Sequence, residues 1–115
     1  MISLCSINDN QYHKGTAYCT AMKPMANMPR IECLCPTKDL VYGYKYDSKS
    51  VEWYTNGYRA LLASKWADVK QWLDSLKVDE DMALVCYCKE GVFCHRQLMM
   101  QMIEKWRPDI SIVLH

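Results

Sequence analysis

The stretch that decides the fold runs from Met82 to Arg96 and reads MALVCYCKEGVFCHR. Its first seven residues, 82–88, form an unbroken apolar run, which is typical of a strand buried on both faces of a parallel sheet. A short loop around Gly91 follows, and apolar residues at helical spacing then predict a helix over residues 94–106. In open α/β sheets, ligands bind at the carboxyl ends of the strands, so this loop is a candidate binding position.

Hydrophobic periodicity places the remaining elements around this unit. Alternating residues predict short strands over residues 2–7 and 31–35, and a closing strand over residues 110–114. Three more helices are predicted, one after the N-cap Thr37, one after the N-cap Ser50, and one over residues 65–76. The segment 8–30 is polar and then rich in Met and Pro, and no regular element is predicted there.

The chain of 115 residues is predicted to be a single α/β domain covering residues 1–115. The order of strands and helices predicts a small three-layer sandwich with a central, mostly parallel sheet. No apolar run reaches the roughly 18 residues that a membrane span needs, and the first residues lack the pattern of a signal peptide. Seven cysteines without such a signal indicate reduced thiols in a cytoplasmic protein.

The charge balance bears on the class of partner. The 14 Lys and Arg residues are mixed with 13 Asp and Glu residues, and the formal net charge is only +1. Proteins that bind DNA or RNA electrostatically usually carry a basic excess or a basic stripe. We therefore expect neither nucleic acid nor a membrane among the partners.

Cys94, His95 and Arg96 stand at the start of the last predicted helix. Backbone N–H groups and the helix dipole at such a position favour a thiolate and a bound anion. Cys94 is therefore a candidate nucleophile, His95 a candidate acid or base, and Arg96, with Gly91, a candidate ligand of an anion. In the alternative interpretation Cys94 is a small core residue and Arg96 pairs with an internal carboxylate. The spacing of a cysteine-phosphatase loop is absent, because Arg96 lies eight positions after Cys88 rather than six.

Two further groups of residues are candidates for the same site. Lys45, Tyr54 and Tyr58 would orient a ligand from the opposite wall, and Cys88 would contact it from the end of the strand. Tyrosines four positions apart on a helix are also typical of core residues with a solvated hydroxyl, which is the alternative for Tyr54 and Tyr58.

A metal site is the less favoured interpretation of the cysteines. Cys-x-Cys occurs twice, in residues 33–35 and 86–88, and with Cys94 and His95 these thiols could form a tetrahedral site. Ligands of structural zinc usually stand in knuckle turns with wider spacing, whereas Cys-x-Cys within a strand is more typical of packing. We therefore predict no metal site, and the residues identify no cofactor.

Residues 84–98 and 36–62 together resemble the domain of unknown function 488 family, in its short phage-type branch. The first block carries a Cys-x-Cys strand followed by Cys-His-Arg at the start of a helix, and the second carries Pro-Thr, Tyr-Lys and Tyr-Thr pairs at the familiar intervals. The resemblance implies a small α/β domain with a central parallel sheet, in a bacteriophage or bacterial cytosolic protein. It implies no particular activity.

The positions that match recurring residues of the branch are Cys94, His95, Arg96, Lys45, Tyr54 and Tyr58. The chain departs from larger members of the family at the second strand. Those members often carry an Asp-Val-Arg segment there, and residues 32–36 of this chain read ECLCP instead.

Together, these observations predict a protein that binds a small phosphorylated or nucleotide-like ligand at residues 89–96 and acts on it through Cys94 or His95. The residues leave open whether the protein is an enzyme. The alternative is a phage-encoded protein that sequesters or blocks a host protein within a defence system. For that function the 4 Trp, 8 Tyr and 8 Met residues would supply the contact surface.

Overall fold

In the computed structural model, which describes residues 1–88 and 93–115, four strands form one parallel sheet in the order β2-β3-β1-β4. The strands are β1 (Ile2–Ser6), β2 (Thr16–Cys19), β3 (Met82–Cys86) and β4 (Ile112–Leu114). Ile2 is in register with Met82 and with Ile112, and Thr16 is also in register with Met82. The carboxyl ends of all these strands therefore meet at one edge of the sheet.

Six helical elements accompany the sheet among the described residues. They are η1 (Asn10–Tyr12), η2 (Glu32–Leu34), α1 (Lys38–Tyr46), α2 (Val51–Ser64), α3 (Trp66–Ser75) and α4 (His95–Trp106). The predicted N-caps are confirmed, because the Thr37 hydroxyl accepts a hydrogen bond from the N–H of Leu40 at 3.3 Å, and the Ser50 hydroxyl accepts one from Trp53 at 3.0 Å. None of the helices in the described part of the chain is long and apolar enough to cross a membrane.

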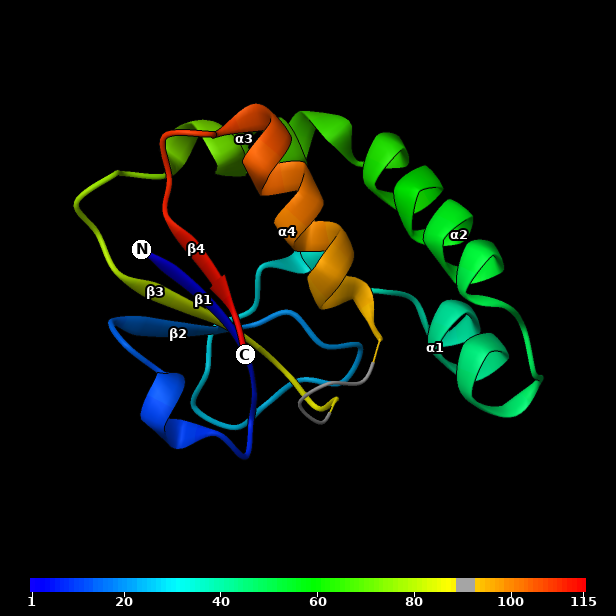
Figure 1. The fold of residues 1–115 in the computed structure, drawn as a ribbon. Helices are drawn as coiled ribbons and strands as arrows, with labels where there is room; N and C mark the ends of the chain where they lie inside the picture. Colours follow the sequence, from blue (N-terminus) through cyan, green and yellow to red (C-terminus); the bar gives the residue numbers. More distant parts are fainter. Residues whose placement is uncertain (89–92) are drawn as a thin grey trace.

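The sheet separates two apolar clusters, which confirms the predicted α/β sandwich. Ile2, Leu4 and Leu84 pack on one face against α2, α3 and α4. Cys5 and Val85, which point the other way, pack against the segment that follows β2. In Figure 1, α4 crosses the helical face of the sheet, and η1 lies on the opposite side.

The helices α1 and α2 lie side by side, on the side of the molecule toward which the strand ends point (Figure 1). Their position matters for function, because it brings α1 next to the edge of the sheet where β3 ends. The end of β3, the start of α4 and α1 therefore surround a space at this edge of the sheet.

The predicted strand over residues 31–35 is wrong. The chain touches the sheet there only through a single bridge between Cys19 and Arg30, and it then turns into η2. Cys33 and Leu34 are adjacent in sequence and both are buried, a pattern that a strand with one buried face does not give. The neighbouring strand is instead β2, within the segment for which no element was predicted.

The central strand also ends earlier than predicted. The ladder of β3 stops at Cys86, and Tyr87 and Cys88 lie in a bend beyond it. Because Cys88 is outside the ladder, its side chain is not restricted to the alternation of the strand. This difference shapes the thiol cluster described below.

Candidate functional site

A cavity of about 470 Å³ lies at the carboxyl edge of the sheet, within the size range of small-molecule sites. The end of β3, the start of α4, and α1 and α2 all contribute to its wall. Its described lining includes six tyrosine and phenylalanine rings, which are Tyr42, Tyr44, Tyr46, Tyr54, Tyr87 and Phe93. Lys23 and Lys45 also line it. Among the described lining residues, the cavity is therefore rich in aromatic rings and carries two cationic side chains.

Three of these rings, Tyr44, Tyr54 and Phe93, form one connected wall. The ring centroids of Tyr44 and Tyr54 are 5.3 Å apart, and Phe93 lies 6.0 Å from Tyr44 and 6.1 Å from Tyr54. The ring planes of the Phe93 pairs are close to perpendicular, an arrangement that aromatic side chains favour. Such a wall suits a flat, π-rich ligand.

Cys94 lies where the cavity meets α4, and it is the N-cap of that helix. Its Sγ accepts hydrogen bonds from the Arg96 backbone N–H at 3.4 Å and from the Arg96 Nε at 3.1 Å. The side-chain oxygen of Gln97 in turn accepts a hydrogen bond from the Cys94 N–H at 2.9 Å. The sulfur therefore lies among donors and at the positive end of the helix dipole, both of which favour a thiolate.

Cys94 also belongs to a cluster of three thiols. The sulfurs of Cys86, Cys88 and Cys94 all lie within 4.8 Å of one another, and those of Cys86 and Cys94 are 4.0 Å apart. All three residues line the cavity. Cys33 and Cys35, which the sequence placed in the same hypothetical metal site, are not members of this cluster within residues 1–88 and 93–115.

The pKa of each of the three thiols depends on its hydrogen bonds with the other two. Hydrogen bonds from Cys86 and then Cys88 lower the pKa of Cys94 well below its ordinary value, against the opposing effect of burial, and His95 lowers it further. Hydrogen bonds to Cys88 and Cys94, together with burial, raise the pKa of Cys86. For Cys88, the bond with Cys86 lowers the pKa, but the bond with Cys94 and burial outweigh it, so the pKa is raised. The cluster therefore holds its negative charge on Cys94.

His95 lines the cavity next to Cys94 and is fixed from the opposite side of its ring. Its Nε2 lies 2.6 Å from the carbonyl oxygen of Thr20. Because a carbonyl oxygen only accepts, Nε2 carries a hydrogen and donates it. The ring also packs edge-on against Tyr58, with centroids 5.5 Å apart. The His95 ring is therefore held in place, and Nδ1 is the ring nitrogen that can exchange a proton with a ligand.

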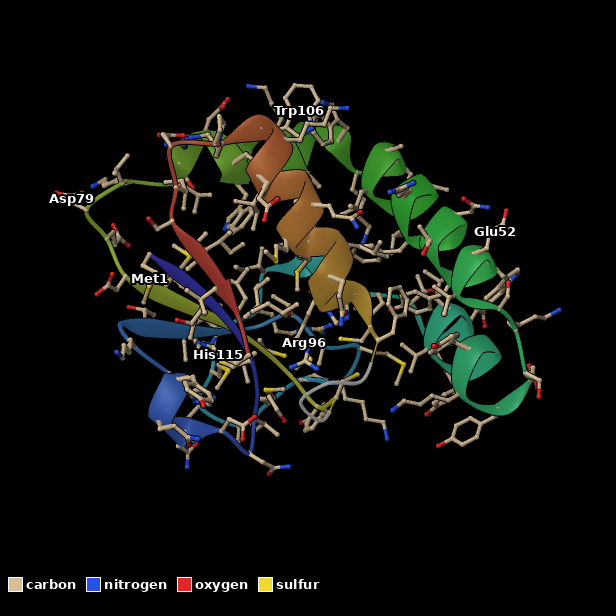
Figure 2. The ribbon with its side chains drawn as sticks, in the orientation of Figure 1. Met1, Glu52, Asp79, Arg96, Trp106 and His115 are labelled. Atoms are coloured by element: carbon tan, nitrogen blue, oxygen red, sulfur yellow. The ribbon has the colours of Figure 1, made fainter. Side chains whose placement is uncertain are left out.

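Arg96 is placed differently from what its sequence position suggests. Its side chain is only 1% exposed and is not among the described lining of the cavity. Besides the bond to Cys94, its Nη1 donates to the carbonyl oxygen of His115 at 3.5 Å. Figure 2 shows Arg96 below the start of α4, in the interior of the molecule. The contacts of Arg96 therefore include the thiol of Cys94 and the carbonyl oxygen of His115.

The other predicted residues divide between cavity and core. Lys45 and Tyr54 line the cavity with Cys88, as the sequence-based hypothesis requires. Tyr58 lies in the core, fully buried, and its hydroxyl donates to the Leu34 carbonyl at 2.7 Å. Gly91 lies outside the residues that the structure describes.

Several lining residues were missed by the sequence analysis. Tyr42, Tyr44 and Tyr46 alternate on the short helix α1, and Phe93 immediately precedes Cys94. The density of aromatic residues in residues 42–46 was a usable signal. Lys23 carried no signal, because it comes from the segment without predicted structure.

Comparison with known proteins identifies a family. A family model described as "DUF488-N3a: Active DUF488-N3 subclade" matches residues 2–107, which is nearly the whole chain. No curated protein and no solved structure matches the chain.

Proposed function

The chain belongs to the DUF488 family, and on that premise and the geometry of the cavity we propose that it binds a small nucleotide-like anion at the edge of its sheet. One observation carries the proposal. A single cavity combines a connected aromatic wall with Cys94 and His95 at the start of a helix. A flat base would stack on the wall, and a phosphate or carboxylate would meet the cations and the helix start.

In this proposal, lysine side chains supply the positive charges that contact the anion. Lys45 is exposed, lines the cavity, and lies close enough to Cys88 for its charge to oppose part of the rise in the pKa of that thiol. Lys23 lines the cavity from the segment after β2. Arg96 would act through Cys94 instead of binding the anion, because its guanidinium is buried beside the sulfur.

We further propose that the protein acts on its ligand, with Cys94 as the nucleophile and His95 as the acid or base. The donors around the Cys94 sulfur support the first role, and the bond from His95 to Thr20 supports the second, because it fixes the ring. A nucleophile, a neighbouring imidazole and a third group that orients it form the usual arrangement of thiol enzymes. The description of the matching subclade as active is in keeping with an enzyme.

Ligand binding is tested by calorimetric titration with the four common ribonucleoside monophosphates. At least one is expected to bind, and Lys45→Ala should weaken it by about tenfold or more, since a charge-assisted hydrogen bond contributes about 1.5–3 kcal/mol. Lys49→Ala is the matched control. Lys49 is exposed nearby, packs over the Trp53 ring, and is not in the described lining of the cavity. Equal effects of the two substitutions, or no binding at all, would contradict the proposal.

Catalysis is tested with the nucleotide that binds. Incubation with the wild-type protein, followed by mass spectrometry of the nucleotide, should reveal a product. Cys94→Ser is expected to abolish its formation, because a serine hydroxyl is not ionised near neutral pH. Cys33→Ser, which changes a buried thiol outside the cluster, should leave product formation intact. Product formation that survives Cys94→Ser would exclude the nucleophilic role.

A further inference from the structure

The cluster of Cys86, Cys88 and Cys94 has a geometry that ligand binding alone does not require. In a tetrahedral zinc–thiolate site the Zn–S bonds of about 2.3 Å place neighbouring sulfurs roughly 3.8 Å apart. The sulfurs of Cys86 and Cys94 are 4.0 Å apart, and all three lie within 4.8 Å of one another. We propose that these three thiols bind one Zn²⁺ ion and leave a coordination position open to the cavity.

The backbone fixes two of the three ligands in place. Cys86 is the last residue of β3, and its carbonyl oxygen accepts a hydrogen bond from the Ile7 N–H at 2.8 Å. Cys94 is held by the capping bonds of α4. Cys88 lies in the bend beyond the strand, so it can turn toward the other two sulfurs. This placement removes the sequence-based argument against a metal, which assumed that Cys86 and Cys88 both lie in the strand.

The surroundings of the cluster suit a group with excess negative charge. Three thiolates around Zn²⁺ carry a net charge of −1. The Arg96 guanidinium donates to the Cys94 sulfur at 3.1 Å, and the Arg96 backbone N–H does so at 3.4 Å. Hydrogen bonds of this kind to ligating sulfurs orient and stabilise metal sites.

The site would be of the open type. Among residues 1–88 and 93–115, no fourth Cys, His, Asp or Glu completes the cluster. His95 is nearby, but its Nε2 is bonded to Thr20, and neither of its ring nitrogens lies within 4.8 Å of all three sulfurs. Sites with three protein ligands and a free position are typical of catalytic zinc. The zinc inference stands without the proposed nucleotide binding, but it excludes the nucleophilic role of Cys94 in the zinc-bound protein, because a thiolate that ligates Zn²⁺ is not a free nucleophile. That the open position meets the anion of a bound nucleotide rests on the proposed function.

The test begins with protein dialysed against EDTA under reducing conditions and titrated with Zn²⁺ alone. One Zn²⁺ per chain is expected, and Co²⁺ in its place should give the near-ultraviolet absorption of thiolate-to-metal charge transfer. Cys88→Ser should weaken Zn²⁺ binding by more than about 100-fold, since even substitutions around the ligands of a metal cost 10–100-fold. Cys88 is the least buried of the three, so its substitution disturbs the core least. Cys33→Ser, in a buried thiol outside the cluster, should keep the affinity.

Zinc binding that is absent, or that Cys88→Ser and Cys33→Ser weaken equally, would overturn the inference. If Cys88→Ser fails to fold by circular dichroism, X-ray absorption at the zinc edge of the wild-type protein decides instead. Three sulfurs and one lighter atom are expected, and any other sulfur count would contradict the site. Lys45→Ala separates the two proposals, because it should keep Zn²⁺ affinity and weaken nucleotide binding.

Discussion

Tyr54 and Tyr58 lie one turn apart on α2, and their stacked ring centroids are 6.4 Å apart. The surroundings of the two residues nevertheless differ. Tyr54 contributes its ring to the aromatic wall of the cavity. Tyr58 has no exposed surface, and its hydroxyl satisfies the buried carbonyl oxygen of Leu34. Their spacing in the sequence suggests the same role for both residues. Their contacts instead give Tyr54 a ligand-binding role and Tyr58 a structural one.

Tyr58→Phe should therefore lower the free energy of unfolding by about 1–3 kcal/mol, because it leaves the Leu34 carbonyl buried without its donor. It should leave nucleotide affinity unchanged. Tyr54→Leu should instead weaken nucleotide binding, since it removes a ring from the wall. Urea unfolding and calorimetric titration of both variants check this pair. The reverse pattern, with nucleotide binding lost only in Tyr58→Phe, would contradict the assignment.

How far single residues could be predicted depends on how local their partners are. Thr37 and Ser50 cap helices through donors three positions away, and both were predicted correctly. The surroundings of Arg96 could not be predicted, because one of its partners is the carbonyl oxygen of His115. Spacing within a helix start shows that Cys94, His95 and Arg96 are together, but it does not show which of them faces a cavity.

Among the strands, β2 is the one that was not predicted from the sequence. It has four residues at the edge of the sheet, and only Cys19 at its end is buried, so no apolar alternation marks it. The segment 31–35 does alternate, yet its carbonyl oxygens at Ile31 and Glu32 accept bonds from residues three positions ahead and form a turn. Alternation in a short segment thus predicted a strand where local turn bonds prevailed.

The position of β2 depends on Gly15, which precedes it with φ +72°. A Cβ at this position would lie 2.0 Å from the backbone oxygen of Asp81, next to the start of β3. Gly15→Ala should cost about 1–3 kcal/mol from backbone strain alone, and the close approach adds to it. The neighbouring Lys14→Ala, at an exposed position, should change stability by less than about 0.5 kcal/mol. Thermal unfolding of both variants checks this, and equal midpoints would contradict the described turn.

At the scale of the whole molecule, the core holds several groups that ionise only at high pH. Burial raises the pKa of Cys5 from 9.0 to about 11, and it raises the pKa of Tyr54 and Tyr58 above their ordinary value of 10.0. Each of these groups is neutral in the folded protein and ionises more easily in the unfolded chain. The free energy of unfolding should therefore fall at alkaline pH.

The direction of this effect follows from proton binding. Below pH 9 the Cys5 thiol is protonated in both states, and its contribution to stability is complete. Between about pH 9 and pH 11 the unfolded chain loses the proton while the folded protein keeps it, so the free energy of unfolding falls, by about 3 kcal/mol in total for this thiol. Urea unfolding at a series of pH values should show the decline, and Cys5→Ala should make it shallower. An identical slope in Cys5→Ala would contradict this source.

The overall architecture was the most predictable level. The buried run of β3, the capped helices and the Cys-His-Arg helix start defined a parallel α/β fold, and the structure confirms it. The cavity was less predictable, because α1 and the segment after β2 reach it from distant parts of the chain. The thiol cluster depended on one detail, the end of the β3 ladder at Cys86, and strand ends are set by pairing between strands rather than by local sequence.

The cavity should give small molecules access to the thiols of Cys88 and Cys94. Mass spectrometry of the metal-free protein, reacted with iodoacetamide for increasing times, measures the modification rate at each cysteine. Cys88 and Cys94 should react faster than Cys5 and Cys33, because the first two line the cavity and the other two are protected in the core. Modification of Cys94 no faster than that of Cys5 would contradict the account.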